Sequence, residues 1–263
     1  ATQIDIGKVH CLLAEIERKS EHYKQAIEAY REALKIYTFE SFPMEYANSQ
    51  KYLGDIYRNM AAWEEDGADY KAAAAIYEEA LQAYMAKNSV ADCAIVQNEL
   101  GNVYSILGGI EGGTRYCRKA IAAFEEVLRT WTREIDPIRY ADCLYKLGKE
   151  YLWLAKIEDP LANTRQAIDA ISAALDVQPA EGSTLDYNNM RIQLGNAYYD
   201  LALITREIAD CRNAIETYEN ILKTTEPGRP DLDYYLIQKN LGNVYCLLAG
   251  LEDKPEYYHR SIQ

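Results

Sequence analysis

The 263-residue chain has few of the residues that bind nucleic acid. It contains 28 lysines and arginines against 41 aspartates and glutamates, for a formal net charge of −13, and binding to a phosphate backbone needs clustered basic side chains. The same charge weakens attraction to an anionic membrane surface. No run of about 18 apolar residues, long enough to span a bilayer, occurs in the sequence. We therefore expect neither a nucleic-acid nor a membrane partner.

Motifs of catalysis and cofactor binding are equally scarce. The sequence contains no glycine-rich phosphate loop, no His-Glu-x-x-His, no Cys-x-x-Cys and no Gly-x-Ser-x-Gly, the patterns that mark several common reaction classes. We expect a protein that is not an enzyme and that needs no cofactor or metal. The first residues also lack the basic and apolar regions of a signal peptide, so a cytoplasmic location is expected.

A five-residue phrase recurs along the chain. Leu100 to Tyr104, which reads Leu-Gly-Asn-Val-Tyr, returns unchanged at Leu241 to Tyr245. The glycine of this phrase is one of a series spaced 47 residues apart, here called the repeat glycines: Gly7, Gly54, Gly101, Gly148, Gly195 and Gly242. A constant period of this size is typical of solenoids, in which each unit buries its apolar face against its neighbours.

Each repeat is predicted to form two helices, with positions counted from the repeat glycine. Leucine at −1, tyrosine at +3 and an apolar residue at +6 give the first, helix A, an apolar stripe at helical spacing, although the first repeat has Ile6 at −1 and His10 at +3. We expect it to begin near Pro43, Pro137 or Pro230, with Asp136 as an N-cap. The second, helix B, carries a small residue at +19 and a large one at +23, which we expect to fill the gap between neighbouring repeats. An apolar residue at +9 is interpreted as a buried plug at the turn.

The six cysteines follow the same period. Cys11 and Cys246 both lie at +4, and Cys117 and Cys211 both lie at +16. Equivalent positions in different repeats favour small, buried packing residues over disulfide bonds or metal ligands, since free cysteine is commonly buried. A reducing compartment is the expected setting.

The two helical patterns together resemble the tetratricopeptide repeat (TPR). Leu-Gly-x-x-Tyr stands on helix A, and Ala-x-x-x-Tyr/Phe-x-x-Ala stands on helix B, for example at Ala26, Tyr30 and Ala33. The common repeat has about 34 residues, so the helices or connections here are longer, and the pattern is similar to long-period repeats of archaeal and bacterial multidomain proteins. The resemblance implies an all-α, α-α superhelix of antiparallel helix pairs. Residues 1–263 would form a single array of about five and a half repeats, cut within a repeat at both ends.

The resemblance also implies where a ligand binds. In TPR proteins helix A lines a concave groove, and ligand peptides are often held there by side chains close to the repeat glycine. An asparagine at such a site can bond a peptide backbone as both donor and acceptor. We expect that replacing Asn102 and Asn196 together by alanine abolishes partner binding and leaves helicity and melting unchanged. The candidate groove residues are Lys51, Asp55, Arg58, Asn98, Asn102, Tyr145, Lys149, Asn196, Tyr199, Lys239 and Asn243.

The leading hypothesis is a scaffold or sensor that binds a protein or peptide in this groove. One alternative is an array that self-associates end to end, because exposed repeat ends present helix faces. Another is a regulatory domain of a fused effector, since long-period arrays often adjoin caspase-like (CHAT) peptidase or signalling ATPase domains. Lys239 with Asn243 matches the first half of the carboxylate clamp that holds chaperone tails, but Asn98 and Ile192 replace the lysine in other repeats. RNA binding by helical repeats conflicts with the acidic charge.

Overall fold

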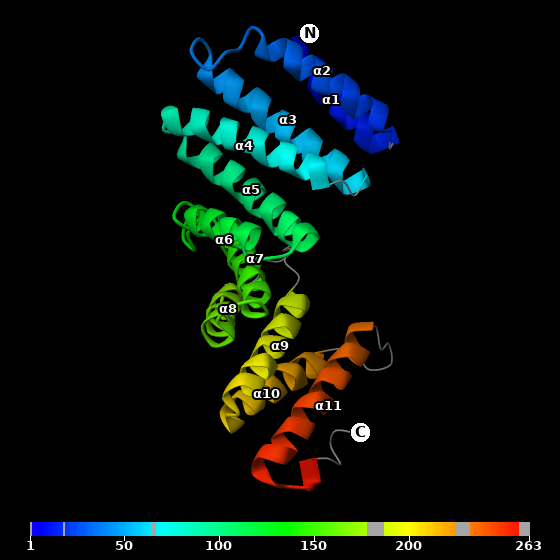
Figure 1. The fold of residues 1–263 in the computed structure, drawn as a ribbon, viewed down its shortest axis with the longest axis vertical. Coiled ribbons are helices and arrows are strands. Elements are labelled where there is room, and N and C mark those ends of the chain that lie inside the picture. Colours follow the sequence, from blue (N-terminus) through cyan, green and yellow to red (C-terminus); the bar gives the residue numbers. More distant parts are fainter. Residues whose placement is uncertain (1, 18, 65–66, 178–186, 225–231, 258–263) are drawn as a thin grey trace. The chain divides into compact units, whose positions relative to one another are not determined.

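The structure is a computed structural model that describes residues 2–17, 19–64, 67–177, 187–224 and 232–257. Across these ranges the regular structure is helical and no strand is present (Figure 1). The all-α class predicted from the sequence is therefore confirmed. The helices are α1 (Gln3–Glu17), α2 (Ser20–Leu34), α3 (Pro43–Glu64), α4 (Gly67–Ala86), α5 (Val90–Glu111), α6 (Arg115–Leu128), α7 (Pro137–Ala155), α8 (Pro160–Leu175), α9 (Tyr187–Thr205), α10 (Ile208–Thr224) and α11 (Leu232–Glu252).

The helices fall into two compact units. Ala1–Trp131 forms the first, with α1 to α6, and Thr132–Gln263 forms the second, with α7 to α11. Within each unit every helix packs against the next one in the chain, and Figure 1 shows them as antiparallel pairs. The odd-numbered helices contain the repeat glycines and are the predicted A helices, and the even-numbered ones are the predicted B helices.

Proline and a capping aspartate set the start of two predicted helices. α3 begins at Pro43 and α7 at Pro137. The N–H groups of the first helical turn have no partner within the helix, so the missing N–H of proline costs no hydrogen bond there. The Asp136 carboxylate accepts a hydrogen bond from the backbone N–H of Arg139 at 3.0 Å, which confirms the predicted N-cap. Pro230 lies outside the described residues.

The repeat glycines are required by the contact between helix A and helix B. A Cβ atom on Gly54 would lie 2.7 Å from the ring of Tyr77, and one on Gly101 would lie 2.5 Å from Phe124, well inside the separation of a favourable carbon contact, about 3.5–4.0 Å. The large side chain at +23 thus lies on the glycine of its own repeat, in addition to the place between repeats expected from the sequence. The same contact joins Gly7 to Tyr30, Gly148 to Ile171 and Gly195 to Tyr218.

The tyrosine at +3 links helix A to helix B of the preceding repeat. Arg31 Nη2 donates a hydrogen bond to the Tyr57 hydroxyl at 2.9 Å, whereas the Tyr245 hydroxyl donates to Glu219 Oε1 at 2.9 Å. Each partner stands at +24 from its repeat glycine, so three pairs of neighbouring repeats share a polar contact at the same position. The pairs are Arg31 with Tyr57, Glu78 with Tyr104, and Glu219 with Tyr245.

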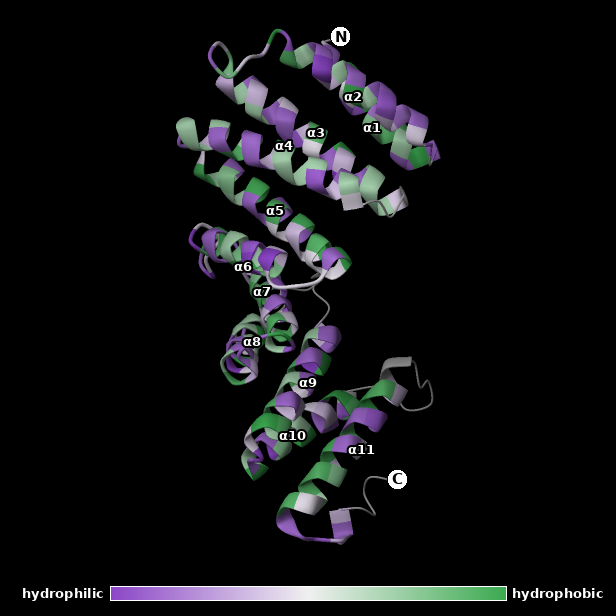
Figure 2. Cartoon of the chain, viewed as in Figure 1, coloured by the Kyte–Doolittle hydropathy of each residue, from purple (hydrophilic) through white to green (hydrophobic). Residues whose placement is uncertain are grey.

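Two expectations about burial are wrong. Hydrophobic and hydrophilic residues alternate along the helices (Figure 2), as expected for helices with one face in a core, but the apolar residues at +9 lie on the outside. Their exposed fractions run from 41% at Ile204 to 77% at Ile16 in the first five repeats, because the helix A to helix B turn holds this position away from the core. All six cysteines are free, and Cys246 is exposed on α11 rather than buried.

Candidate functional site

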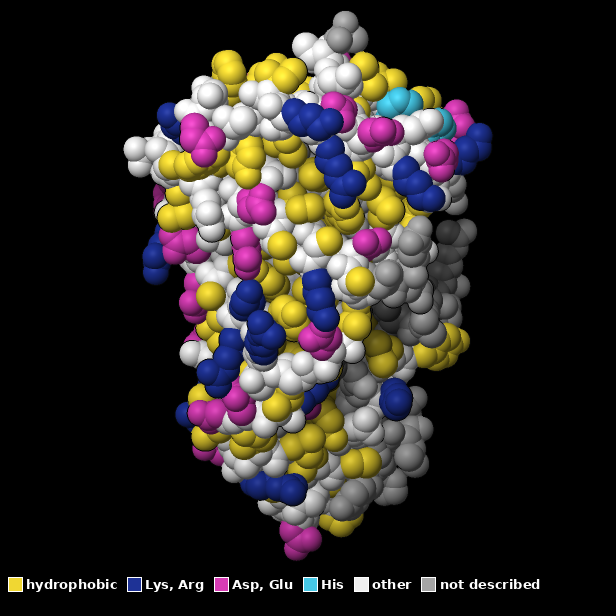
Figure 3. Space-filling model, turned by 45° about the horizontal axis from the view of Figure 1, so that its top comes forward, with side chains coloured by type: hydrophobic (Ala, Val, Ile, Leu, Met, Phe, Trp, Pro, Cys, Tyr) yellow, Lys and Arg dark blue, Asp and Glu magenta, His cyan; other side chains and the backbone are white. Residues whose placement is uncertain are grey.

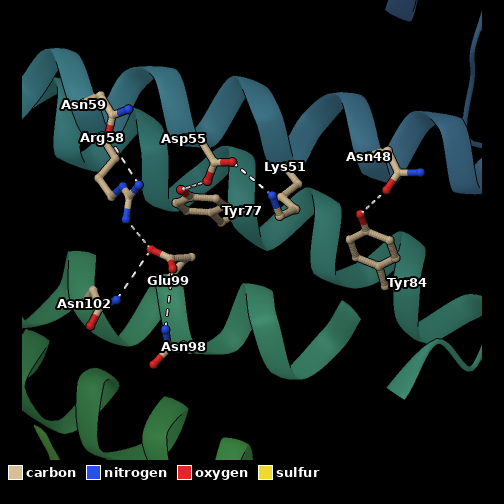
Figure 4. Close-up of polar contacts among 10 residues, drawn as sticks. All are labelled: Asn48, Lys51, Asp55, Arg58, Asn59, Tyr77, Tyr84, Asn98, Glu99 and Asn102. Carbon is tan, nitrogen blue, oxygen red and sulfur yellow. Dashed lines mark hydrogen bonds and ion pairs between the residues drawn. The ribbon is translucent and has the colours of Figure 1, made fainter. Parts of the chain in front are cut away.

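Two helices of the first unit present predicted groove residues close together. α3 carries Lys51, Asp55 and Arg58, spaced about one turn apart along one face, and α5 carries Asn98 and Asn102. Figure 4 shows these side chains with Glu99 of α5 among them. We call Lys51, Asp55, Arg58, Asn98, Glu99 and Asn102 the polar row.

Asp55 is engaged by the fold itself. Its Oδ1 accepts a hydrogen bond from the hydroxyl of Tyr77 at 2.6 Å, and its Oδ2 accepts one from Lys51 Nζ at 3.0 Å. The Tyr77 side chain is fully buried, and burial, followed by the charge of Asp55, raises the pKa of Tyr77 above its usual value. The hydroxyl therefore stays protonated and donates a hydrogen bond to Asp55. Asp55 satisfies a buried polar group, a contact that is costly to break.

An ion pair joins the two helices of the row. Arg58 Nη1 donates to Glu99 Oε2, and Arg58 Nη2 donates to Asn59 Oδ1 at 3.3 Å. Asn98 and Asn102 each donate to Glu99 at 3.5 Å, which is long for a hydrogen bond. Arg58 and Glu99 are partly buried, so solvent and salt screen their attraction less than that of a surface pair.

Glu99 is a member of the row that the sequence did not predict. The predicted groove residues stand at −3, +1 and +4, whereas Glu99 stands at −2. Asn240 stands at −2 in the last repeat and donates through Nδ2 to Asn196 Oδ1 at 2.8 Å. Both Glu99 and Asn240 could have been predicted from the sequence, because each is a polar residue at −2 in a repeat with polar residues at −3 and +1.

Asn102 and Asn196 differ in what faces them. The Asn196 carbonyl oxygen accepts a hydrogen bond from the Tyr218 hydroxyl at 2.6 Å, as Asp55 does from Tyr77. In the repeat of Asn102 the ring at +23 is Phe124, which has no hydroxyl to donate. Asn196 therefore accepts the hydrogen bond of a buried tyrosine, whereas the phenylalanine at +23 in the repeat of Asn102 has no hydrogen bond to donate.

The predicted groove residues of the second unit lie in several settings. Tyr145 is buried in α7, and Lys149 Nζ lies 5.3 Å from the centroid of its ring, a cation–π distance. Tyr199 is half-buried on α9 and packs against the core of α9 to α11. Lys239 and Asn243 are exposed on α11.

The described surface can be compared with what a metal ion, a membrane or a nucleic acid would need. The described residues hold no group of three or more His, Cys, Asp or Glu that could bind a metal ion. None of the helices in the described ranges is long and apolar enough to cross a membrane. On the face drawn in Figure 3, basic and acidic side chains are interspersed, with hydrophobic side chains between them. The exclusion of nucleic-acid and membrane partners stays a prediction.

Known proteins show the same repeat and the same fold. Residues 7–38 match the family model of the tetratricopeptide repeat, starting at the first repeat glycine and including all of α2. No curated protein sequence matches the chain. Three solved structures illustrate the likeness. BtubC (BKLC) from P. vanneervenii is 17% identical with a TM-score of 0.53, covering 94% of this chain and 89% of BtubC. PilF of Pseudomonas aeruginosa is 13% identical with a TM-score of 0.54, covering 98% and 96%. YrrB, a TPR protein with an unusual peptide-binding site, is 18% identical with a TM-score of 0.52, covering 90% and 92%.

The chain therefore contains a tetratricopeptide repeat and has the fold of TPR proteins. This confirms the resemblance and the helical solenoid class inferred from the sequence. The long-period subtype, and a single array running from residue 1 to 263, stay predictions.

Proposed function

We propose that the chain is a protein- or peptide-binding scaffold or sensor module whose ligand lies along the polar row. The observation that carries the proposal is the setting of Asn102. Its amide donates to Glu99 at 3.5 Å, a long bond that a ligand can replace. Phe124 stands at +23 in this repeat. In two other repeats the tyrosine at +23 donates a hydrogen bond to the residue at +1, which is Asp55 or Asn196.

A peptide backbone fits the chemistry of the row. An asparagine side chain offers a carbonyl acceptor and two N–H donors, which complement the N–H and C=O of a peptide unit. Arg58 and Glu99 place opposite charges beside Asn102, so a ligand with side chains of both signs is favoured over one with a single sign. The peptide-binding site of YrrB, which shares the fold, supports a ligand of this class.

Partner capture with matched variants tests the proposal. The natural chain, used as bait in lysate of the organism that makes it, is expected to retain a protein that Asn102→Ala retains about ten-fold more weakly, since leaving a bonded polar group without its partner costs about 1–3 kcal/mol. Asn213→Ala, at an exposed position of α10, is the control and should retain it fully. Circular dichroism must give equal helicity for all three chains. Equal retention by the natural chain and Asn102→Ala would place the ligand elsewhere.

Three predicted groove residues of the second unit are exposed, namely Lys149, Lys239 and Asn243. Lys239 and Asn243 are exposed on α11, and we propose that they form a further ligand contact on that unit. Tyr145 and Asn196 have roles in the fold of that unit. As a sensor, the chain would regulate an effector domain fused to it, of the CHAT-type peptidase or signalling ATPase class.

A second candidate function is self-association, which one face of α1 favours. Ile6 at −1 and Val9 at +2 are 37% and 54% exposed, whereas Leu53 and Ile56, at the same positions of α3, are 5% and 1% exposed. Helix α2 packs on α3 and shares a hydrophobic cluster with Leu53 and Ile56. We propose that a second copy of the chain covers the matching face of α1, in line with the end-to-end contact considered from the sequence.

A further inference from the structure

An apolar groove of about 720 Å³ opens between α4, α5 and α6 of the first unit. Leu81 and Met85 of α4 and Val90 of α5 form apolar walls, and Ala94 and Ala122 line it with small side chains. Its volume lies within the range typical of ligand-binding pockets, about 300–1,000 Å³. The groove shares no residue with the polar row.

The groove coincides with a departure from the repeat pattern. Cys93 lines it and stands at position −8. Every other repeat that contains this position has a tyrosine there, namely Tyr46, Tyr140, Tyr187 and Tyr234. A thiol is much smaller than a phenol ring, so the third repeat has open space where the others carry an aromatic side chain.

The second repeat shows what a tyrosine at −8 contacts. The Tyr46 hydroxyl donates to Glu79 Oε2 at 3.1 Å and accepts from Gln50 Nε2 at 3.0 Å. Gln50 stands at −4 and Glu79 at +25. The third repeat keeps both residue types at these positions, as Gln97 and Glu126, and both line the groove. The two polar residue types that meet a phenol in the second repeat therefore line this groove without the phenol, and Glu126 pairs through Oε2 with Arg129 Nη1 at 2.6 Å.

We propose that this groove binds a tyrosine side chain presented by a partner protein. The ring lies beside Cys93, in the place that Tyr46 fills in the second repeat, and its hydroxyl donates to Glu126 and accepts from Gln97. The exposed apolar side chains of Met85 and Val90 cover the residues that flank the tyrosine. This site is additional to the binding surface on the polar row, and neither proposal depends on the other.

Titration with 4-methylphenol, the tyrosine side chain without its backbone, tests the proposal on the full chain by NMR. The natural chain is expected to bind it saturably at one site. Cys93→Tyr restores the tyrosine of the pattern and is expected to abolish binding, whereas Cys93→Ala keeps the space and the site. Tyr46→Cys is expected to open an equivalent site in the second repeat, so that two molecules bind.

Toluene, which lacks the hydroxyl, separates a tyrosine site from a merely apolar groove. We expect it to bind about five- to ten-fold more weakly than 4-methylphenol, the factor that one net hydrogen bond supplies. Glu126→Ala, an exposed substitution that leaves the core intact, should remove most of that difference even if Cys93→Tyr does not fold, as thermal unfolding will show. Unchanged binding by folded Cys93→Tyr, equal affinity for toluene, or no saturable binding by the natural chain would each overturn the proposal.

Discussion

At the scale of single residues, the side chain at +23 decides what the residue at +1 can do. Where +23 is Tyr77 or Tyr218, its buried hydroxyl uses Asp55 or Asn196 as an acceptor. Where +23 is Phe124, the asparagine at +1 faces a ring with no hydrogen to donate. Two asparagines at the same repeat position of helix A therefore differ in role because of a residue on helix B.

This difference predicts unequal effects on stability. Asn196→Ala should lower the free energy of unfolding by about 1–3 kcal/mol, because the Tyr218 hydroxyl loses its acceptor inside the protein. Asn102→Ala should change it by less than about 0.5 kcal/mol. Adding Tyr218→Phe to Asn196→Ala should restore part of the loss, since the hydroxyl that needs an acceptor is then absent. Urea denaturation measures all three, and equal losses for Asn102→Ala and Asn196→Ala would contradict the assignment.

At the scale of the helix, the closeness of α5 to α6 depends on Gly101. Gly101→Ala should lower the free energy of unfolding by about 1–3 kcal/mol, because its Cβ would lie 2.5 Å from Phe124 and force the two helices apart. A Cβ atom on Gly109, also in α5, would meet no atom of another helix within 4 Å. Gly109→Ala should raise the stability by about 0.5–1 kcal/mol. Thermal or urea unfolding gives both values, and a loss in both variants would show that helix packing at Gly101 is not the cause.

The sequence predicts where helices begin better than it predicts which partners their polar side chains bind. Pro43 and Asp136 mark helix starts because their effects are local, and the glycine spacing reports a contact made in each of the first five repeats. The role of Asn196 could not be predicted from helix A alone, since its partner Tyr218 stands on the following helix. Glu99 was missed for a similar reason, because it gains its ion pair from Arg58 on another helix. Ligand binding by the polar row stays a prediction.

At the scale of the whole molecule, the exposed face of α1 predicts association that depends on concentration. The mass from light scattering should rise above the 30.0 kDa of one chain as the protein is concentrated, and Val9→Lys should return it to one chain by placing a charge on the contact. Pairing of two α1 faces would stop at a dimer, whereas a head-to-tail contact would continue to longer assemblies.

The control for this experiment is Leu203→Lys, which changes an exposed apolar residue of α9 and should leave the association unchanged. A mass that stays at 30.0 kDa over the whole concentration range would rule out the α1 contact.

The hydrogen bond between neighbouring repeats has a consequence for how such a chain can evolve. A phenolic hydroxyl both donates and accepts, so the tyrosine at +3 bonds Arg31 in one repeat and Glu219 in another without any change of its own. A reversal of charge at +24 therefore needs no compensating substitution on the next helix. Copies of the repeat can be duplicated or reordered and can drift in surface charge while the bond that joins them persists. The acidity of the surface is then open to selection by binding partners rather than fixed by the need to stack.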